Sequence, residues 1–286
     1  MSLVQRAKLL ISSISSIKEC IKYGGDIKAN ISTIQYGSLF NKDTHVLITG
    51  GGSGIGLAMA QKFVEQGAKV CVVGRNKTKL ETVRKEINNE NFRIYACDIS
   101  DVKNVSTNID AIENIMGGPL TILINNAGVY SKTHFPNCTE EDWDDVYNIN
   151  AKGTFFLCQE VCKRWINNRV VGITRNIINI SSQGGFVGAN NPYRMTKWDI
   201  RGLTEFLGKE MCKYGIVVNG IAPGIVMTDM QSEFQKQKDN LFTYLTPVKR
   251  LGLPLEIAEL AVYLASDASN FIIGQTIVCD GGYILK

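Results

Sequence analysis

The stretch Val46-Leu-Ile-Thr-Gly-Gly-Gly-Ser-Gly-Ile-Gly56 places a cluster of glycines directly after a short apolar run. The apolar run predicts a buried strand over 46–49, and the residues after the glycines predict a helix. Glycines at such a junction permit a tight turn and let backbone N–H groups approach a pyrophosphate at the positive end of the helix. The spacing Gly50, Gly54, Gly56 differs from the common G-x-G-x-x-G pattern. The interpretation therefore rests on the order of strand, glycines and helix rather than on the spacing.

From His45 onward, short apolar runs alternate with longer amphipathic segments. This alternation is typical of repeated βαβ units, in which helices join parallel strands. Right-handed crossovers place helices on both faces of the sheet and the ligand crevice at the carboxyl ends of the strands. We therefore expect residues 41–286 to form a single α/β domain, a doubly wound parallel sheet of about seven strands with the Rossmann fold. The predicted strands are 46–49, 69–73, 93–97, 120–124, 176–180, 217–221 and 276–279.

Residues 1–40 do not share this alternation. Apolar residues recur there with helical spacing and basic residues lie outside the apolar stripe, which predicts a basic amphipathic extension. Three interpretations stay open: an arm that packs on a partner subunit, a helix that lies on an anionic membrane surface through residues 1–22, and a targeting peptide for an organelle. A secretory signal peptide is not supported, because no uninterrupted apolar core follows the first basic residues.

Composition narrows the class of protein further. Apolar residues make up 44% of the chain, charged residues 20%, and there are only six prolines, which is typical of a globular protein. The net charge of +4 is mild, and no Lys/Arg-rich run follows the extension, so no nucleic-acid partner is expected. No apolar run is long enough to span a membrane. We expect a cytoplasmic protein, unless the extension directs it to a membrane surface or an organelle.

The eight cysteines are interpreted as reduced residues, several of them in the core. Cys158 and Cys162 have the spacing of neighbours on one helix face. However, the chain has only two histidines, His45 and His134, and no Cys-x-x-Cys accompanies the pair. No metal site is therefore expected.

The segment Tyr193-Arg-Met-Thr-Lys197 pairs a phenol with an ammonium group four residues away. On a helix, Lys197 lies one turn beyond Tyr193 on the same face, where a fixed positive charge favours the phenolate. Lowering the pKa of a tyrosine in this way allows it to act as a general acid and base. Because helices contain such pairs by chance, this interpretation depends on companion motifs.

The end of the second predicted strand bears on the choice of nucleotide. A carboxylate at this point bonds the ribose 2′-hydroxyl in NAD-binding proteins of this architecture, whereas this chain has Gly74 and then Arg75. A guanidinium suits a 2′-phosphate, which it bonds in a bidentate manner. NADP(H) is therefore favoured, with NAD(H) left open.

Together, these motifs resemble the short-chain dehydrogenase/reductase family over residues 43–286. The segment Thr49-Gly-Gly-Gly-Ser-Gly-Ile-Gly56 is similar to the cofactor loop of that family, and Asn125-Asn-Ala-Gly128 to its motif after the fourth strand. The resemblance implies catalytic roles for Asn150, Ser182, Tyr193 and Lys197. It implies cofactor contacts by Gly50, Gly52, Ser53, Gly54, Ile55, Gly56, Arg75, Asp98, Ile99, Asn126, Ala127, Gly128, Tyr193, Lys197, Pro223, Gly224, Val226 and Thr228.

The expected reaction is the interconversion of a ketone and a secondary alcohol by an NAD(P)H-dependent oxidoreductase. Tyr193 exchanges a proton with the substrate oxygen, Ser182 hydrogen-bonds that oxygen, and Lys197 lowers the pKa of the phenol and holds the nicotinamide ribose. Asn150 has a donor and an acceptor with which to position a water that relays protons from Lys197. A protein of another class, which senses nucleotides or acts as a scaffold without turnover, remains the alternative.

The substrate stays open among several carbonyl compounds. The tail of the chain is similar to that of 3-oxoacyl-(acyl carrier protein) reductases, but also to sugar, polyol and steroid relatives. A docked acyl carrier protein requires basic residues, and here Arg169 matches the first basic position whereas Tyr214, next to Lys213, takes the second. The loop 183–192, a little shorter than is common in the family, is expected to form one wall of the substrate pocket, with 229–246 closing over it.

The resemblance also implies a homotetramer with two-fold symmetry. One interface is then formed by the helix that follows Asn150 and by the helix that precedes Tyr214. Four apolar residues on the first of these helices are candidates for that interface: Phe155, Phe156, Cys158 and Cys162. Burial inside one subunit explains the same residues equally well.

Overall fold

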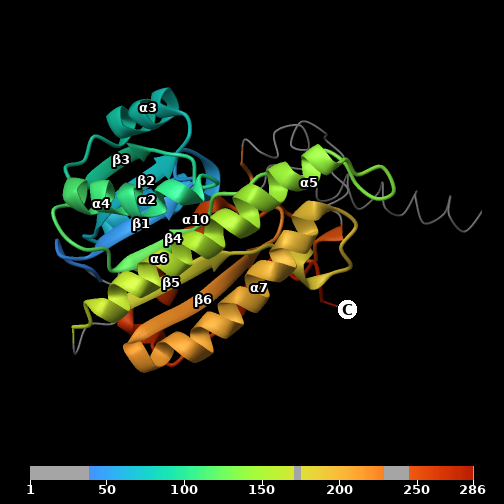
Figure 1. The fold of residues 1–286 in the computed structure, drawn as a ribbon. Helices are drawn as coiled ribbons and strands as arrows, with labels where there is room; N and C mark the ends of the chain where they lie inside the picture. Colours follow the sequence, from blue (N-terminus) through green and yellow to red (C-terminus); the bar gives the residue numbers. More distant parts are fainter. Residues whose placement is uncertain (1–38, 171–174, 229–244, 286) are drawn as a thin grey trace, which may run out of the picture.

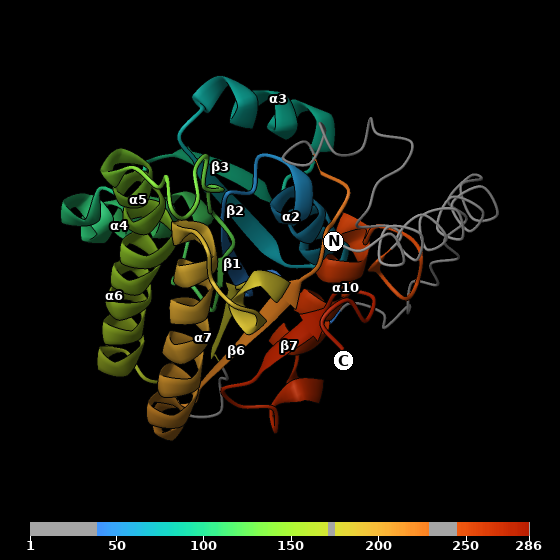
Figure 2. The same ribbon diagram turned by 90° about the vertical axis from the view of Figure 1, so that its right-hand side faces the viewer.

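A seven-stranded parallel sheet forms the centre of the molecule (Figure 1). The computed structural model describes residues 39–170, 175–228 and 245–285. The strand order is β3-β2-β1-β4-β5-β6-β7, and helices cover both faces, as the edge-on view of Figure 2 shows. The predicted fold class, a doubly wound α/β sheet, is confirmed.

The strands are β1 His45–Thr49, β2 Lys69–Gly74, β3 Phe92–Ala96, β4 Ile122–Asn125, β5 Arg175–Ile180, β6 Ile216–Pro223 and β7 Thr276–Cys279. The helices are α2 Gly54–Glu65, α3 Lys77–Ile87, α4 Val105–Met116, α5 Glu140–Tyr147, α6 Thr154–Asn167, α7 Pro192–Met211 and α10 Pro254–Ala265. Short turns of 3-10 helix are η1 Val102–Asn104, η3 Gln183–Phe186, η4 Cys212–Tyr214 and η6 Asp267–Ser269, and η2 Asn148–Gly153 is a π-helical turn.

Each of the seven predicted strands is present, with ends that differ by two residues at most. The fourth begins at Ile122 rather than Leu120, because the Leu120 N–H donates to the Glu113 carboxylate at 3.0 Å instead of entering the sheet. The sixth runs on to Pro223, which pairs in register with Cys279 of β7. Strand ends are therefore set by hydrogen-bond partners that are remote in sequence.

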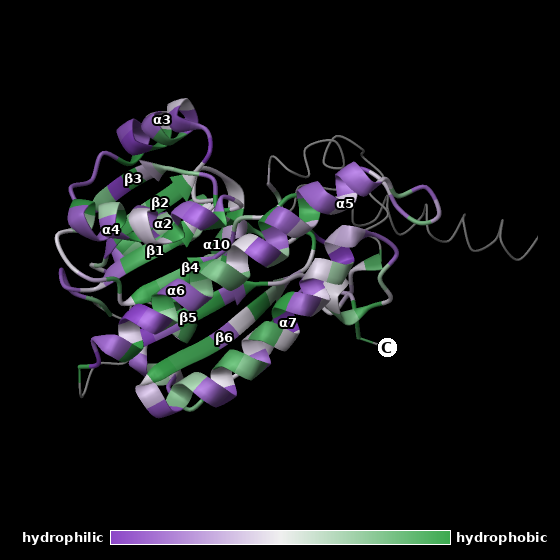
Figure 3. Cartoon of the chain, in the orientation of Figure 1, coloured by the Kyte–Doolittle hydropathy of each residue, from purple (hydrophilic) through white to green (hydrophobic). Residues whose placement is uncertain are grey.

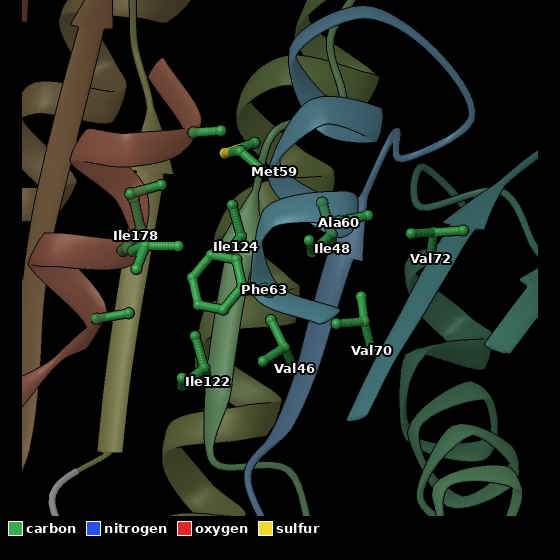
Figure 4. Close-up of a cluster of buried hydrophobic side chains, with 14 of the residues drawn as sticks. Val46, Ile48, Met59, Ala60, Phe63, Val70, Val72, Ile122, Ile124 and Ile178 are labelled. Atoms are coloured by element: carbon green, nitrogen blue, oxygen red, sulfur yellow. The ribbon is translucent and has the colours of Figure 1, made fainter. Parts of the chain in front are cut away.

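Apolar side chains fill the space on both sides of the sheet. One cluster joins β1, β2 and β4 to α2 and α10, and Figure 4 shows Phe63 of α2 among Val46, Ile122 and Ile124. The other joins the opposite face to α4, α6 and α7. Figure 3 shows the strands as a mostly hydrophobic layer between helices of mixed character. Burial on both faces explains why the strands read as continuous apolar runs rather than alternating ones.

Helix α7 lies against the sheet at Gly208, where a side chain does not fit. A Cβ built on Gly208 lies 2.4 Å from the Cα of Gly274, a backbone contact that cannot move aside easily. We expect Gly208→Ala to destabilise the protein by about 1–3 kcal/mol, as for overpacked cores. Gly202→Ala on the same helix meets nothing within 4 Å and is expected to stabilise by roughly 0.5–1 kcal/mol through helix propensity.

Chemical denaturation of both glycine variants measures the difference. Equal stability of Gly208→Ala and Gly202→Ala would contradict the packing argument, because both changes add the same methyl group to one helix.

Most of the predicted extension, residues 1–40, lies outside the described residues. Its last residue, Phe40, stacks on Phe63 with ring centroids 5.3 Å apart, and the Phe40 N–H donates to the Gln66 carbonyl at 3.0 Å. Within the described parts of the chain, no helix combines the length and the apolarity needed to cross a membrane.

Candidate active site

A cavity of about 280 Å³ opens at the carboxyl ends of β1, β4, β5 and β6. The chain reverses its direction of winding between β1 and β4, which is where open α/β sheets bind ligands. The cavity is lined by Gly50, Ser53, Gly54, Ile55, Gly56, Asn126, Ala127, Gly128, Ile180, Ser181, Ser182, Tyr193, Lys197, Pro223, Gly224, Val226 and Thr228. Segments that lie far apart in the sequence thus meet in one place.

The glycine loop between β1 and α2 has little room for side chains. A Cβ on Gly56 would lie 2.4 Å from the Gly50 carbonyl oxygen, and Gly54 has a φ of +55°, which favours glycine. The Thr49 hydroxyl accepts the N–H groups of Asn126 at 3.0 Å and Ala127 at 2.9 Å, so the two loops hold each other. Backbone therefore lines the cavity at the amino end of α2, as binding of a pyrophosphate requires.

The π-helical turn η2 carries Asn150 toward this cavity. The Asn150 Oδ1 accepts the Val129 N–H at 2.8 Å, and its Nδ2 donates to the Val129 carbonyl at 2.9 Å. A Cβ on Gly128 would lie 3.2 Å from the Asn150 Oδ1 and 3.6 Å from the Lys197 Nζ, so both polar atoms approach the same point. Asn150 thus fixes the loop after β4, a role that the sequence did not indicate. Its Oδ1 retains a second lone pair that can accept another hydrogen bond.

Tyr193 and Lys197 lie on the first two turns of α7, as the spacing predicts. The Lys197 Nζ is 5.5 Å from the centre of the Tyr193 ring and donates to the Ile180 carbonyl at 2.8 Å. Ser182 follows β5 as the N-cap of η3, and its hydroxyl accepts the Gly184 N–H at 3.1 Å and lies beside that of Tyr193. Phenol, hydroxyl and ammonium group therefore lie at one end of the cavity.

Burial governs the ionisation of these groups. It raises the pKa of Tyr193 above its ordinary value, although the neighbouring Ser182 hydroxyl acts in the opposite direction. It lowers the pKa of Lys197 to about 8. The expected lowering of the Tyr193 pKa by Lys197 is thus not found in the protein alone, because desolvation of the phenolate outweighs favourable contacts.

The remaining predicted residues lie beside the cavity rather than in it. Gly52 packs against Leu80, and Arg75 is exposed just after β2. Asp98 accepts hydrogen bonds from the N–H and the hydroxyl of Ser100, at 2.9 and 2.7 Å. Ile99 contacts Gly153 of the π-helical turn. Because β2 adjoins β1 and β3 adjoins β2, these positions continue the same edge of the sheet away from Tyr193.

Several residues that shape the site carried no recognisable signal in the sequence. Ser131 accepts the Tyr193 N–H at 2.8 Å, and the Ser181 hydroxyl donates to the Lys197 carbonyl at 2.8 Å. Tyr130 packs its ring on that of Tyr193, with centroids 4.7 Å apart. Their one link to the predicted motifs is their position in the sequence. Ser181 precedes Ser182 directly, and Tyr130 and Ser131 closely follow the motif that ends at Gly128.

Comparison with known proteins identifies the family. A family model described as Enoyl-(Acyl carrier protein) reductase matches residues 50–284. The chain is 34% identical to a 3-oxoacyl-[acyl-carrier-protein] reductase of Rickettsia conorii over 84% of this chain and 96% of the relative. It belongs to the short-chain dehydrogenase/reductase family.

Other members of the short-chain dehydrogenase/reductase family are similar to nearly the same degree. A D-threitol dehydrogenase of Mycolicibacterium smegmatis is 33% identical, over 84% of this chain and 92% of the relative. A solved structure of a variant actinorhodin polyketide ketoreductase with NADPH has a TM-score of 0.78 and 29% identity, covering 86% of this chain and 99% of that one. As a family member, the chain is an oxidoreductase that interconverts a carbonyl compound and an alcohol with a nicotinamide cofactor.

Proposed function

We propose that this protein reduces ketones to secondary alcohols with Tyr193 as the acid and base. The observation that supports it is the meeting of the Tyr193 and Ser182 side chains in the wall of a glycine-lined cavity, next to the buried ammonium group of Lys197. Because burial raises its pKa, Tyr193 carries its proton at neutral pH, as an acid must. Ser182 donates a second hydrogen bond to the substrate oxygen and stabilises the charge that develops there.

The nicotinamide, when bound, supplies or accepts the hydride. The glycine loop would hold the pyrophosphate, and the backbone around Gly128 and Pro223 lines the other wall of the same cavity. Lys197 would hold the ribose, and its charge favours the phenolate after proton transfer. The Asn150 Oδ1, near the Lys197 Nζ, positions a water that returns the proton.

We infer a preference for NADP(H) from Arg75. Its guanidinium is exposed at the carboxyl end of β2, where the ribose of a dinucleotide extended from the glycine loop is expected. Arg75→Ala is expected to lower kcat/KM for NADPH by about 10–100-fold, which is the effect of losing a hydrogen bond to a charged group. The kcat/KM for NADH is expected to change little, because NADH has no 2′-phosphate. Lys85→Ala, which removes another exposed cation in the last turn of α3, is the matched control.

Steady-state kinetics with both nucleotides give the answer. A loss of equal size for NADPH and NADH would remove the argument for recognition of a 2′-phosphate, and NAD(H) would become the favoured cofactor.

For the substrate we propose a 3-oxoacyl thioester, in keeping with the family model and the Rickettsia relative. The carrier-docking positions bear on this proposal. Arg169 and Lys213 lie beyond the last residues of α6 and α7. Tyr193 is at the other end of α7, which has 20 residues, so Lys213 is roughly 30 Å from Tyr193. A carrier docked there serves the site of a neighbouring subunit rather than the site of its own chain. The thioester proposal therefore requires an oligomer in which these helix ends approach another site.

A sugar or polyol substrate is the second candidate, by analogy with the D-threitol dehydrogenase. The Gln183 Oε1, directly after Ser182, is buried without a hydrogen-bond partner among the described residues, and it lies near Gly224. An unpaired acceptor of this kind suits a substrate hydroxyl group. The loop 183–192 thus offers polar recognition, whereas most of 229–246 lies outside the described residues.

The test follows nicotinamide absorbance with NADPH and with NADH against a 3-oxoacyl thioester, several keto sugars and a 3-ketosteroid. Turnover of the thioester alone would support the first candidate, and turnover of the sugars alone would support the second. Tight cofactor binding without turnover of any compound would contradict the proposed reaction and favour the nucleotide-sensing alternative.

We propose a homotetramer, with α6 and α7 in one interface. Cys158 and Cys162 are buried within the subunit, whereas Phe155 of α6 and Phe206 of α7 are 47% and 60% exposed. These two rings border an apolar groove of about 430 Å³ between the helices. A second copy that packs its own α6 and α7 here buries the groove in an isologous contact.

Phe206→Glu is expected to convert the tetramer into dimers, because it places a charge in the apolar groove. Light-scattering mass measures the change, and Ile115→Glu on α4, also partly exposed, is the control. An unchanged mass for Phe206→Glu would exclude this groove from the interface.

Three predicted roles of residues 1–40 remain: an arm that packs on a partner subunit, a helix on a membrane surface and a targeting peptide. We propose a cytoplasmic location for the protein. The alternatives are peripheral membrane contact through residues 1–22 and delivery to an organelle. The reaction proposed above involves none of these residues.

A further inference from the structure

Tyr130 combines an exposed aromatic ring with a contact to the proposed acid. Its side chain is 50% exposed, yet its ring lies 4.7 Å from that of Tyr193, tilted by 44°. An aromatic residue that contributes to a core is normally buried. Packing of the core therefore does not account for Tyr130.

The backbone on both sides of Tyr130 is firmly held. Asn150 bonds both the N–H and the carbonyl of Val129, and the buried Ser131 hydroxyl accepts the N–H of Tyr193. Further along, Asp142 accepts the N–H groups of Lys132 at 3.0 Å and Thr133 at 3.1 Å. The loop that carries Tyr130 is thus tied to the π-helical turn, to α7 and to α5. Its ring is presented at a fixed place beside the reactive phenol rather than on a loose loop.

We propose that Tyr130 is a specificity-determining residue, whose ring forms the wall of the substrate subsite and selects ketones that are flat or unbranched at the carbon next to the carbonyl group. The inference rests on the proposed role of Tyr193, because a substrate oxygen bonded to that hydroxyl brings its substituents close to the adjacent ring. A flat ring packs well against a methylene chain or a planar group, and a branch at the first carbon collides with it. The electrostatic effect of Tyr130, which also raises the pKa of Tyr193, agrees with the close approach of the two phenols.

The test uses two ketones that differ by one methyl group at this carbon, ethyl 3-oxopentanoate and ethyl 4-methyl-3-oxopentanoate, with the full-length protein and NADPH. The wild type is expected to prefer the unbranched compound. Tyr130→Ala is expected to raise kcat/KM for the branched compound relative to the unbranched one by about tenfold or more, the discrimination that one methyl group provides in a fitted pocket. Tyr130→Trp enlarges the wall and is expected to move the ratio in the opposite direction.

Two controls separate this role from a structural one. Tyr130→Phe keeps the ring and is expected to keep the ratio, while its pH profile moves because the second phenol is gone. Phe135→Ala removes a ring that is 79% exposed on the same loop and is expected to leave the ratio unchanged.

Equal ratios for the wild type, Tyr130→Ala and Tyr130→Trp would overturn the proposal, provided that the wild type turns over at least one compound. If the wild type turns over neither, the proposed reaction on such ketones has failed instead.

Discussion

Tyr193→Phe is expected to lower kcat by about 10²–10⁴-fold while cofactor binding is kept, because proton transfer to the substrate oxygen loses its donor. The change removes one oxygen atom and leaves the ring contacts with Tyr130 and Lys197 in place. Single-turnover kinetics with NADPH measure the loss, and quenching of protein fluorescence measures cofactor affinity. Tyr95→Phe, which removes a hydroxyl bonded to Asn108 at 3.1 Å, is the matched control away from Lys197.

Retained turnover in Tyr193→Phe would assign the proton transfer to another group. The pH dependence adds a second check. Since burial raises the pKa of Tyr193, ketone reduction is expected to persist across neutral pH, whereas alcohol oxidation, which requires the phenolate, is expected to rise toward alkaline pH.

Lys197→Met is expected to lower kcat/KM by about 10²–10³-fold, because the nearly isosteric side chain has no charge to favour the phenolate and no donor for the ribose. The same variant is expected to change how the free energy of unfolding depends on pH. Lys197 is only 5% exposed, and the fall of its pKa from 10.5 to about 8 corresponds to roughly 3 kcal/mol.

The direction of this pH dependence follows from the number of protons that each state binds. Between pH 8 and 10.5 the unfolded chain holds the Lys197 proton and the folded chain releases it, so the wild type gains stability as the pH rises through this window. Lys197→Met lacks this gain. Its loss of the hydrogen bond to Ile180 is a constant that does not alter the slope.

Urea denaturation of both proteins at several pH values measures the difference in the free energy of unfolding. Parallel stability profiles across the window would show that Lys197 keeps an ordinary pKa in the folded protein. The explanation given for the activity loss, the missing charge and donor, would be unaffected.

The general architecture was accessible from the sequence because parallel strands place their carboxyl ends at one edge. Once the strands after Thr49, Asn125 and Ile180 were recognised, the motifs that follow them had to converge. The position of Tyr193 on a helix followed from helical spacing and from Pro192 at its first turn. The family assignment agrees with these local patterns, while the roles of the individual side chains stay proposals.

The rest depended on contacts that no local pattern encodes. The ring of Tyr130 packs on that of Tyr193 because Ser131 and Asn150 fix the loop that carries Tyr130. Asn150 and Tyr193 come from segments that are remote from this loop in the sequence. The direction of the Tyr193 pKa was mispredicted for a similar reason. It is decided by desolvation from many tertiary neighbours, whereas helical spacing reports only the one charge at Lys197.

The π-helical turn η2 has a consequence for how the protein tolerates change. Helix α5, η2 and α6 form one rod in Figure 1, and the wide turn holds one residue more than a regular turn would. A deletion of one residue within this turn therefore leaves a regular α-turn, so α6 keeps its register and its buried Cys158 and Trp165 keep their places. The same deletion removes the wide turn that carries Asn150, whose side chain fixes the loop after β4. We expect a shortened turn to keep the fold and to lose the proposed site, so the extra residue belongs to the chemistry rather than to the core.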